Sequence, residues 1–269
     1  VDADAFQAAW GRISEHFDAL FTTDHSINKL KETILQLAVM GKLVSQDSSD
    51  EPTQSLINTL LSKNKKNQTQ QRQATAVKSD DVLEIPSSWE WVKINDLMQP
   101  NRKISYGIIK LGLEPNSGGV PTLRCSDVKP GYINPSDIRM VRQDIEEAYA
   151  RTRLLGGEVL INIRGTLGGV ALVSSDFAGC NIAREVAMLP VDDMVVGTYL
   201  VYVLMSPFFW SELNANLRGI AYKGLNLGSL REVLIPLPPL AEQHRIVAKV
   251  DELLALCDQL KSSLQQAQE

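Results

Sequence analysis

Two segments of the chain, one near each end, repeat apolar residues at helical spacing. In both, apolar side chains recur at alternating steps of four and three, which lines one stripe of an α-helix. The first stripe consists of Phe6, Trp10, Ile13, Phe17 and Leu20. The second consists of Ile246, Val250, Leu253, Cys257, Leu260 and Leu264. Because neither glycine nor proline interrupts residues 240–269, we predict a coiled-coil helix there, with segment 6–20 as its candidate partner.

Shorter helices are expected between these two stripes. A second helix is predicted from about Ile27, with Ser26 as a possible N-cap, to a stop at Gly41. A third, short helix is predicted after Pro52. Residues 62–81 contain almost nothing that could enter a core, so we interpret them as a flexible linker.

The middle of the chain has the pattern of a mixed domain. Short β-like runs at 159–163, 170–173 and 186–189 are set between glycines, asparagines and prolines. One further helix is expected over 198–215. We therefore predict an α+β fold, in which a globular domain of short strands and helices carries long coiled-coil-forming helices.

The predicted organisation has four parts. Their boundaries are 1–61 for the N-terminal helices, 62–81 for the linker, 82–236 for the globular domain and 237–269 for the C-terminal helix.

Composition excludes several classes of protein. No stretch approaches the roughly 18 to 20 apolar residues that span a bilayer, and the acidic start of the chain is unlike a signal peptide. We therefore expect a cytoplasmic protein. The three cysteines, Cys125, Cys180 and Cys257, are scattered and odd in number, and the three histidines lack metal-ligand spacing. Neither a disulfide framework nor a metal site is predicted.

The net charge of −5 does not by itself suggest a nucleic-acid-binding protein. Residues 1–61 contain 4 Lys and Arg residues and 9 Asp and Glu residues, whereas residues 82–235 contain 15 and 16 respectively. A surface for nucleic acid would therefore need basic side chains from the middle of the chain gathered on one face.

Three motifs carry a family resemblance. The segment IPLPPLAEQHRIVAKVDELLALCDQL, residues 235–260, resembles the end of a target-recognition domain in the specificity subunits of type I restriction-modification systems. The segment ILQLAVMGKLVSQDSSDEP, residues 34–52, resembles their helical spacer. Between them, GGEVLINIRGTLGGV is similar to the core of the recognition domain, with Glu158 where aspartate is commoner.

The resemblance implies a non-catalytic subunit that reads one half of a bipartite target in double-stranded DNA. Its helices would set the spacing and hold methyltransferase subunits, which carry the S-adenosylmethionine site, while restriction subunits join the complex. Members usually contain two recognition domains, whereas this sequence contains one and shows no internal repeat. It is either a fragment or a half-subunit, and we expect two copies to associate through the terminal helices.

Catalytic alternatives find little support in the sequence. The tetrapeptide Asn134–Asp137 superficially resembles the NPP-aromatic motif of adenine methyltransferases but lacks the aromatic residue, so a turn is the better interpretation. Residues 90–93 do not form a nuclease motif, and no phosphate-binding loop is present in the sequence. The alternative that remains is a coiled-coil scaffold that binds protein instead of DNA.

The resemblance transfers no DNA contacts, so side-chain chemistry narrows the field. Base edges are read best by Arg, Lys, Asn and Gln, while phosphates are held by basic and hydroxyl side chains and by main-chain N–H groups. Loops rich in such residues are the candidates. They are Arg102, Lys103, Tyr106 and Lys110, then Arg164 and Thr166 beside glycines, then Arg184, and finally Arg218, Tyr222, Lys223 and Asn226.

Overall fold

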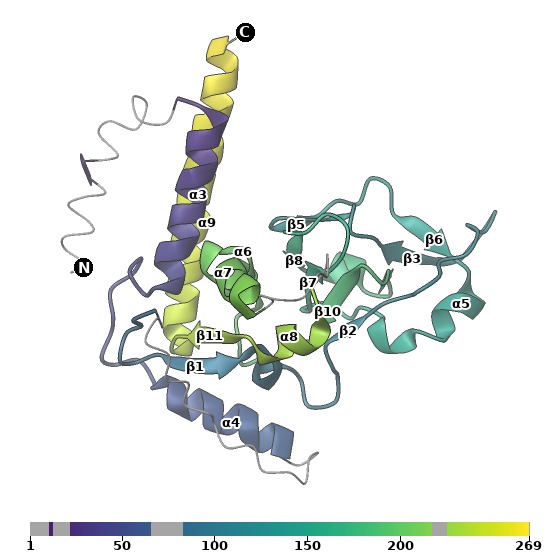
Figure 1. Cartoon of the computed structure of the whole chain (residues 1–269), viewed down its shortest axis with the longest axis horizontal. Helices are drawn as coiled ribbons and strands as arrows, with labels where there is room; N and C mark the ends of the chain where they lie inside the picture. The colour runs from purple at the N-terminus through teal and green to yellow at the C-terminus, as the bar shows by residue number, and fades with distance from the viewer. Residues whose placement is uncertain (1–10, 13–21, 66–82, 217–224, 269) are drawn as a thin grey trace.

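The protein combines a tall helix pair with a body rich in short strands. The computed structural model describes residues 11–12, 22–65, 83–216 and 225–268. In Figure 1, helices α3 and α9 stand side by side, and the strands β2 to β10 form a lobe that extends away from them. The mixed α+β class predicted from the sequence is confirmed.

Helix α3 spans Asp24–Val39 and begins three residues earlier than predicted. Its N-cap is Thr23, whose hydroxyl accepts a hydrogen bond of 3.1 Å from the main-chain nitrogen of Ser26. Ser26 in turn accepts from the nitrogen of Thr23 at 3.2 Å, so it completes a capping box instead of serving as the cap. The expected stop is confirmed, because Gly41 has a φ of +66° directly after the helix.

Helix α9 spans Leu240–Gln268 and packs against α3 in the antiparallel direction. Lys261 lies 3.4 Å from Asp24, and Lys31 lies 2.5 Å from Asp258. The predicted stripe faces α3 and the core, since five of its six side chains are buried and the sixth packs against the same core. Among the described residues, the partner of α9 is therefore α3. Segment 6–20, the partner predicted from the sequence, lies outside the described residues apart from 11 and 12, so that pairing stays a prediction.

Helix α4 spans Thr53–Lys65, where the third helix was predicted. It continues four residues past the expected start of the linker, because Lys63 forms ion pairs with Asp192 at 2.9 Å and Asp193 at 3.1 Å. The rest of the predicted linker, from residue 66, lies outside the described residues.

The largest sheet has four antiparallel strands in the order β2-β10-β7-β8. These strands span Ser105–Tyr106, Val186–Leu189, Val159–Asn162 and Val170–Leu172 respectively. The last three confirm the β-like runs identified in the sequence. Both faces of this sheet are buried: Val159 and Ile161 enter the core shared with α3 and α9, whereas Leu160 enters a second core. A nearly continuous apolar run follows from such double burial.

Smaller elements complete the lobe and connect it to the helices. A three-stranded sheet has the order β6-β3-β9, a hairpin joins β4 to β5, and β1 pairs with β11. The strands are β1 Glu90–Lys93, β3 Val120–Leu123, β4 Val128–Lys129, β5 Tyr132–Ile133, β6 Arg139–Val141, β9 Asn181–Ile182 and β11 Leu234–Leu237. The short helices are η1 Ile94–Leu97, α5 Gln143–Glu147, η2 Ala150–Thr152, η3 Ser175–Phe177 and α8 Leu227–Glu232.

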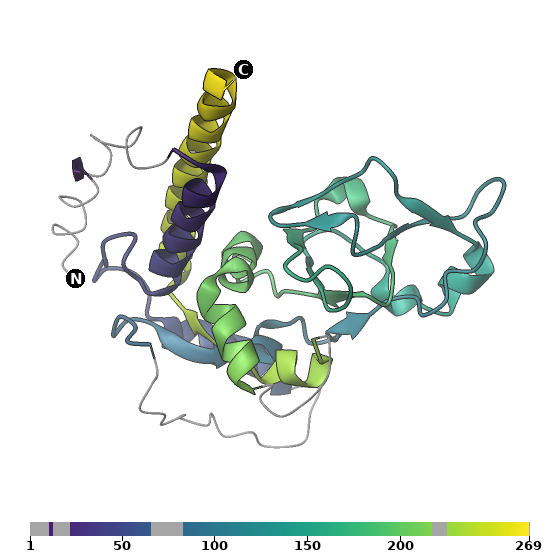
Figure 2. The ribbon, with the colours of Figure 1, turned by 45° about the horizontal axis from the view of Figure 1, so that its top comes forward.

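The helix expected over 198–215 is two helices. Helix α6 spans Gly197–Met205 and α7 spans Pro207–Asn216. Proline disfavours helical backbone in the residue before it, and Ser206 is extended, with ψ at 150°. Figure 2 shows α6 and α7 between the tall helices and the strand-rich lobe, and α6 contacts α3 and α9 as well as β7 and β8.

Candidate nucleic-acid interface

Strand topology brings three predicted residues to one end of the four-stranded sheet. Strand β10 runs antiparallel to both β2 and β7, so the ends of β2 and β7 meet the start of β10. Tyr106 closes β2, Arg164 follows β7 and Arg184 precedes β10. Residues far apart in the sequence therefore converge on one surface.

These three side chains line a single cavity of about 120 Å³, together with Ile109. We call it the recognition pocket. All four lining residues are exposed. Ile109 was not predicted from the sequence, although the pair Ile108–Ile109 offered a signal: in an extended segment, adjacent side chains point to opposite faces, and here Ile108 is buried.

Main-chain hydrogen bonds fix one side of the pocket. The nitrogen of Arg184 donates to the oxygen of Ile108 at 2.9 Å, and the nitrogen of Ile108 donates to the oxygen of Ile182 at 2.8 Å. This parallel bridge needs Gly107, because a Cβ atom there would lie 1.8 Å from the oxygen of Ile182. The segments that carry Ile109 and Arg184 are consequently held side by side.

The loop after β7 forms the other side and is fixed by Asn162. The side-chain nitrogen of Asn162 donates to the main-chain oxygens of Cys125 at 2.9 Å, Val128 at 3.1 Å and Thr166 at 3.0 Å. Sequence reasoning missed this residue, although a lone asparagine inside the apolar run VLINI is a signal that could have identified it. Asn162 ties the loop of Arg164 to the turn before β4.

The pocket is suited to an anionic or acceptor-rich ligand with an apolar part. Arg164 and Arg184 supply two guanidinium groups, which form directional hydrogen bonds with phosphate or base acceptors. Tyr106 and Ile109 add an aromatic ring and an apolar side chain. Basic and aromatic side chains combined in this way are typical of nucleic-acid-binding surfaces.

Three other predicted residues are exposed near the pocket but do not line it. Lys110 follows Ile109, and Thr166 lies on the loop of Arg164. Lys103 precedes β2. Their place as DNA contacts stays a prediction.

Two predicted DNA contacts also have structural roles in this fold, and DNA contact by them stays a prediction. The guanidinium of Arg102 pairs with the buried carboxylate of Glu158 at 2.5 Å and donates to the oxygen of Arg153 at 2.9 Å. Asn226 is the N-cap of α8, where its side chain accepts from the nitrogen of Gly228 at 2.7 Å. The charge of Arg102 and the side-chain oxygen of Asn226 are therefore already paired within the chain. The remaining candidates, Arg218, Tyr222 and Lys223, lie outside the described residues.

The two terminal motifs quoted above meet at the base of the helix pair. Glu242 is fully buried and accepts hydrogen bonds from Trp89 at 2.9 Å and Gln46 at 2.5 Å. Arg245 forms a bidentate ion pair with Asp50, with hydrogen bonds of 2.6 and 3.0 Å. Burial raises the pKa of Glu242, and the hydrogen bonds from Trp89 and Gln46 offset part of this rise. These contacts fix the base of α9 against the segment that follows α3.

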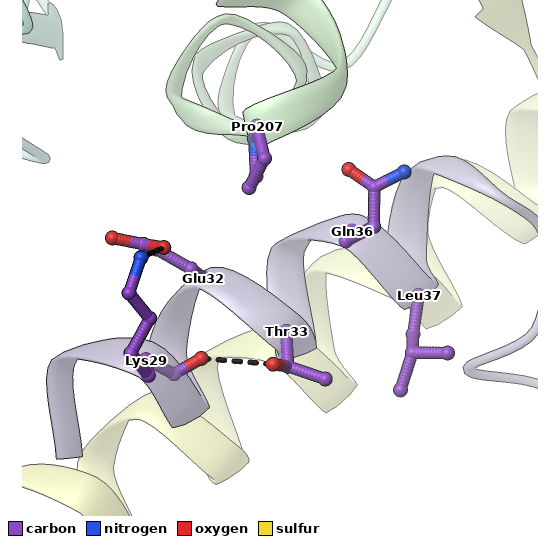
Figure 3. Close-up of a pocket in the computed structure, with 6 residues that line it drawn as sticks. All are labelled: Lys29, Glu32, Thr33, Gln36, Leu37 and Pro207. Atoms are coloured by element: carbon purple, nitrogen blue, oxygen red, sulfur yellow. Dashed lines mark hydrogen bonds and ion pairs between the residues drawn. The ribbon is translucent and has the colours of Figure 1, made fainter. Parts of the chain in front are cut away.

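A second hollow, of about 210 Å³, lies between α3 and the start of α7. In Figure 3, Gln36 and Leu37 lie along α3, and Pro207 faces them from α7. Lys29 and Glu32 pair with each other at 2.6 Å, so their charges are already matched. This hollow is therefore a weaker candidate for a binding site than the recognition pocket.

The described residues form no cluster of three or more histidine, cysteine or carboxylate side chains that could hold a metal ion. Within the same ranges, no helix is sufficiently long and apolar to cross a membrane. The expected turn at residues 134–137 is confirmed, because the side-chain oxygen of Asn134 accepts from the nitrogen of Ser136 at 3.2 Å.

Comparison with known proteins gives one consistent result. The family model of the type I restriction modification DNA specificity domain matches residues 86–268. The chain is 31% identical over 271 residues to the EcoAI specificity subunit of Escherichia coli, a match that covers 97% of the chain and 45% of that protein. It is 28% identical over 301 residues to the EcoEI specificity subunit of the same organism, covering 100% and 47%.

Among solved structures, the HsdS subunit from Thermoanaerobacter tengcongensis superimposes with a TM-score of 0.48 and 21% sequence identity. The match covers 94% of this chain and 52% of that one. The chain spans about half the length of the curated relatives it matches.

Proposed function

Because the chain belongs to the type I restriction modification DNA specificity family, we propose that it reads one half of a bipartite DNA target through the recognition pocket. The observation that carries this proposal is the convergence of Tyr106, Arg164 and Arg184 on one cavity. Two guanidinium groups beside an aromatic ring match the acceptors of phosphates and base edges.

We assign Arg164 to the DNA backbone. It lies at the start of a loop in which Gly165 and Gly168 have φ angles of +72° and +93°. Glycines leave room for a phosphate to approach the main chain closely, and arginine neutralises its charge.

We propose that the outer faces of α3 and α9 dock a methyltransferase subunit. The helix pair stands clear of the lobe, and its inner seam is filled by the chain itself (Figure 1). Outward side chains of α3 such as Asn28 and Glu32 are exposed and available for this partner. The methyltransferase subunit would bring S-adenosylmethionine, and restriction subunits would join through the assembled complex.

We further propose that a second copy supplies the other half of the target. The predicted pairing through the α9 stripe is revised, because Ile246, Val250 and Leu253 are buried within one chain. Contact between copies would therefore use outward residues such as Leu256. A closed pair is two-fold symmetric, so its half-targets would be identical and inverted.

Titration of random duplex libraries at two salt concentrations tests the central proposal. We expect enrichment of particular sequences, and an affinity that falls with log salt at a slope of about −0.9 per neutralised phosphate. A chain that binds no duplex at either salt concentration, and instead captures protein partners through α3 and α9, would be the coiled-coil scaffold.

A further inference from the structure

The recognition pocket has an apolar wall that a phosphate would not use. Ile109 is 43% exposed and Tyr106 is 39% exposed, directly beside the two arginines. A phosphate gains from guanidinium groups and nothing from an isoleucine side chain. A base edge in the major groove presents acceptors, and thymine adds a methyl group, so the edge matches both halves of the pocket.

Ile109 and Arg184 also lie on the same side of the pocket. The nitrogen of Arg184 donates to the oxygen of Ile108 at 2.9 Å, next to the parallel bridge between Ile108 and Ala183. Arg164 lies on the other side, where its nitrogen donates to the oxygen of Glu185 at 3.2 Å, so the two sides differ in chemistry and not in order. Base reading requires placement to within about 0.5 Å, which the main-chain pairing supports for Ile109 and Arg184. The apolar side chain beside Arg184 suits this side of the pocket to a base edge.

We infer that Ile109 and Arg184 read one base step in the major groove. Ile109 contacts the C5 methyl group of a thymine, and Arg184 donates to N7 and O6 of an adjacent guanine, the pairing that arginine geometry favours. This assignment rests on the proposed function and adds to it the bases that the pocket reads.

Chemically altered bases test this inference on the full chain. In the duplex that the chain selects from a random library, each thymine is replaced in turn by uracil, which lacks only the methyl group. We expect one replacement to weaken binding about fourfold, the value for one buried methyl group. In Ile109→Ala the same replacement should have no effect, whereas Leu113→Ala, which changes an exposed leucine outside the pocket, should behave like the unaltered chain.

The guanine contact has a matching probe. Replacing the adjacent guanine by 7-deazaguanine removes the N7 acceptor and should weaken binding by the unaltered chain but not by Arg184→Ala. If Arg184→Ala weakens all duplexes equally and no thymine is sensitive to uracil, the pocket holds a phosphate and the inference is overturned. A chain that selects no sequence at all would instead contradict the proposed function, so the two failures are distinguishable.

Discussion

The side-chain nitrogen of Asn162 lies 3.0 Å from the main-chain oxygen of Thr166, so a buried strand residue holds the loop that carries Arg164. The same nitrogen contacts two further carbonyl oxygens, of Cys125 and Val128. The shape of this loop is therefore set from beneath the surface.

The first prediction follows from these contacts. Asn162→Asp keeps the size of the side chain but replaces the donor by a carboxylate that faces three carbonyl oxygens. We expect the free energy of unfolding to fall by about 2 kcal/mol, the cost of leaving buried groups unpaired, and DNA affinity to fall with it. Urea denaturation measures the first effect. Asn116→Asp, at an exposed asparagine, is the control and should leave stability within about 0.5 kcal/mol.

The second prediction separates two adjacent basic residues that look alike in the sequence. Arg102→Ala leaves the buried Glu158 carboxylate without its cation, so we expect a loss of about 3 kcal/mol of stability. Lys103→Ala, at the exposed neighbour, should change stability little. Chemical denaturation of both variants makes the comparison, and equal stability would contradict the structural role given to Arg102.

Arg164→Ala should affect DNA binding more than stability, which is the reverse of the effect expected for Arg102→Ala. The side chain is exposed, so its loss should cost at most about 1 kcal/mol of stability. Binding should weaken nearly equally for all duplexes, and the salt slope should become shallower by about one unit, as expected for a phosphate contact. Selectivity lost at a single base position would instead identify Arg164 as a base reader.

Helix α9 provides a matched pair of leucines. Leu253 is buried against the core, so Leu253→Asp places a charge in an apolar site and should unfold the chain. Leu256→Asp, one turn away and 44% exposed, should leave the fold intact. Circular dichroism tests both expectations. In sedimentation, Leu256→Asp should reduce any association between copies, and association equal to that of the unaltered chain would exclude this residue from the interface.

Stability should depend on pH through Glu146. Its ion pair with Arg153 and its hydrogen bond from Asn181 at 2.8 Å lower the pKa of Glu146 below the ordinary 4.5. A lowered pKa means that the ionised carboxylate stabilises the folded state above about pH 4.5, and that this contribution is lost as pH falls through the folded value. Across this range, the free energy of unfolding of Glu146→Gln should approach that of the unaltered chain as pH falls. The control Glu147→Gln changes an exposed carboxylate, so its free energy of unfolding should differ little from that of the unaltered chain.

Regular patterns were the most predictable part of the fold. The α9 stripe, the apolar runs of β7, β8 and β10, and the turn at residues 134–137 follow from spacing or residue type alone. The helix break at Pro207 was missed, although proline restricts the residue before it and so provided a signal in the sequence. The partner of α9 was not predictable in the same way, because segment 6–20 and α3 both carry apolar stripes.

The candidate site was predictable only in its cationic and aromatic parts. Chemistry selected Tyr106, Arg164 and Arg184, and strand pairing then brought them together. The same chemistry also selected Arg102 and Asn226, because sequence does not show that a buried carboxylate or a helix end already engages a side chain. Ile109 and Asn162 were missed, since their roles depend on neighbours that are distant in the sequence.

The antiparallel course of α3 and α9 has a topological consequence. Asp24 near the start of α3 and Lys261 near the end of α9 lie 3.4 Å apart, so the described fold is entered and left at the same tip of the helix pair. The described chain between them returns to the point from which it started. Because its entry and exit lie together, such a unit can be joined to a neighbouring segment at this tip without threading new chain through either core.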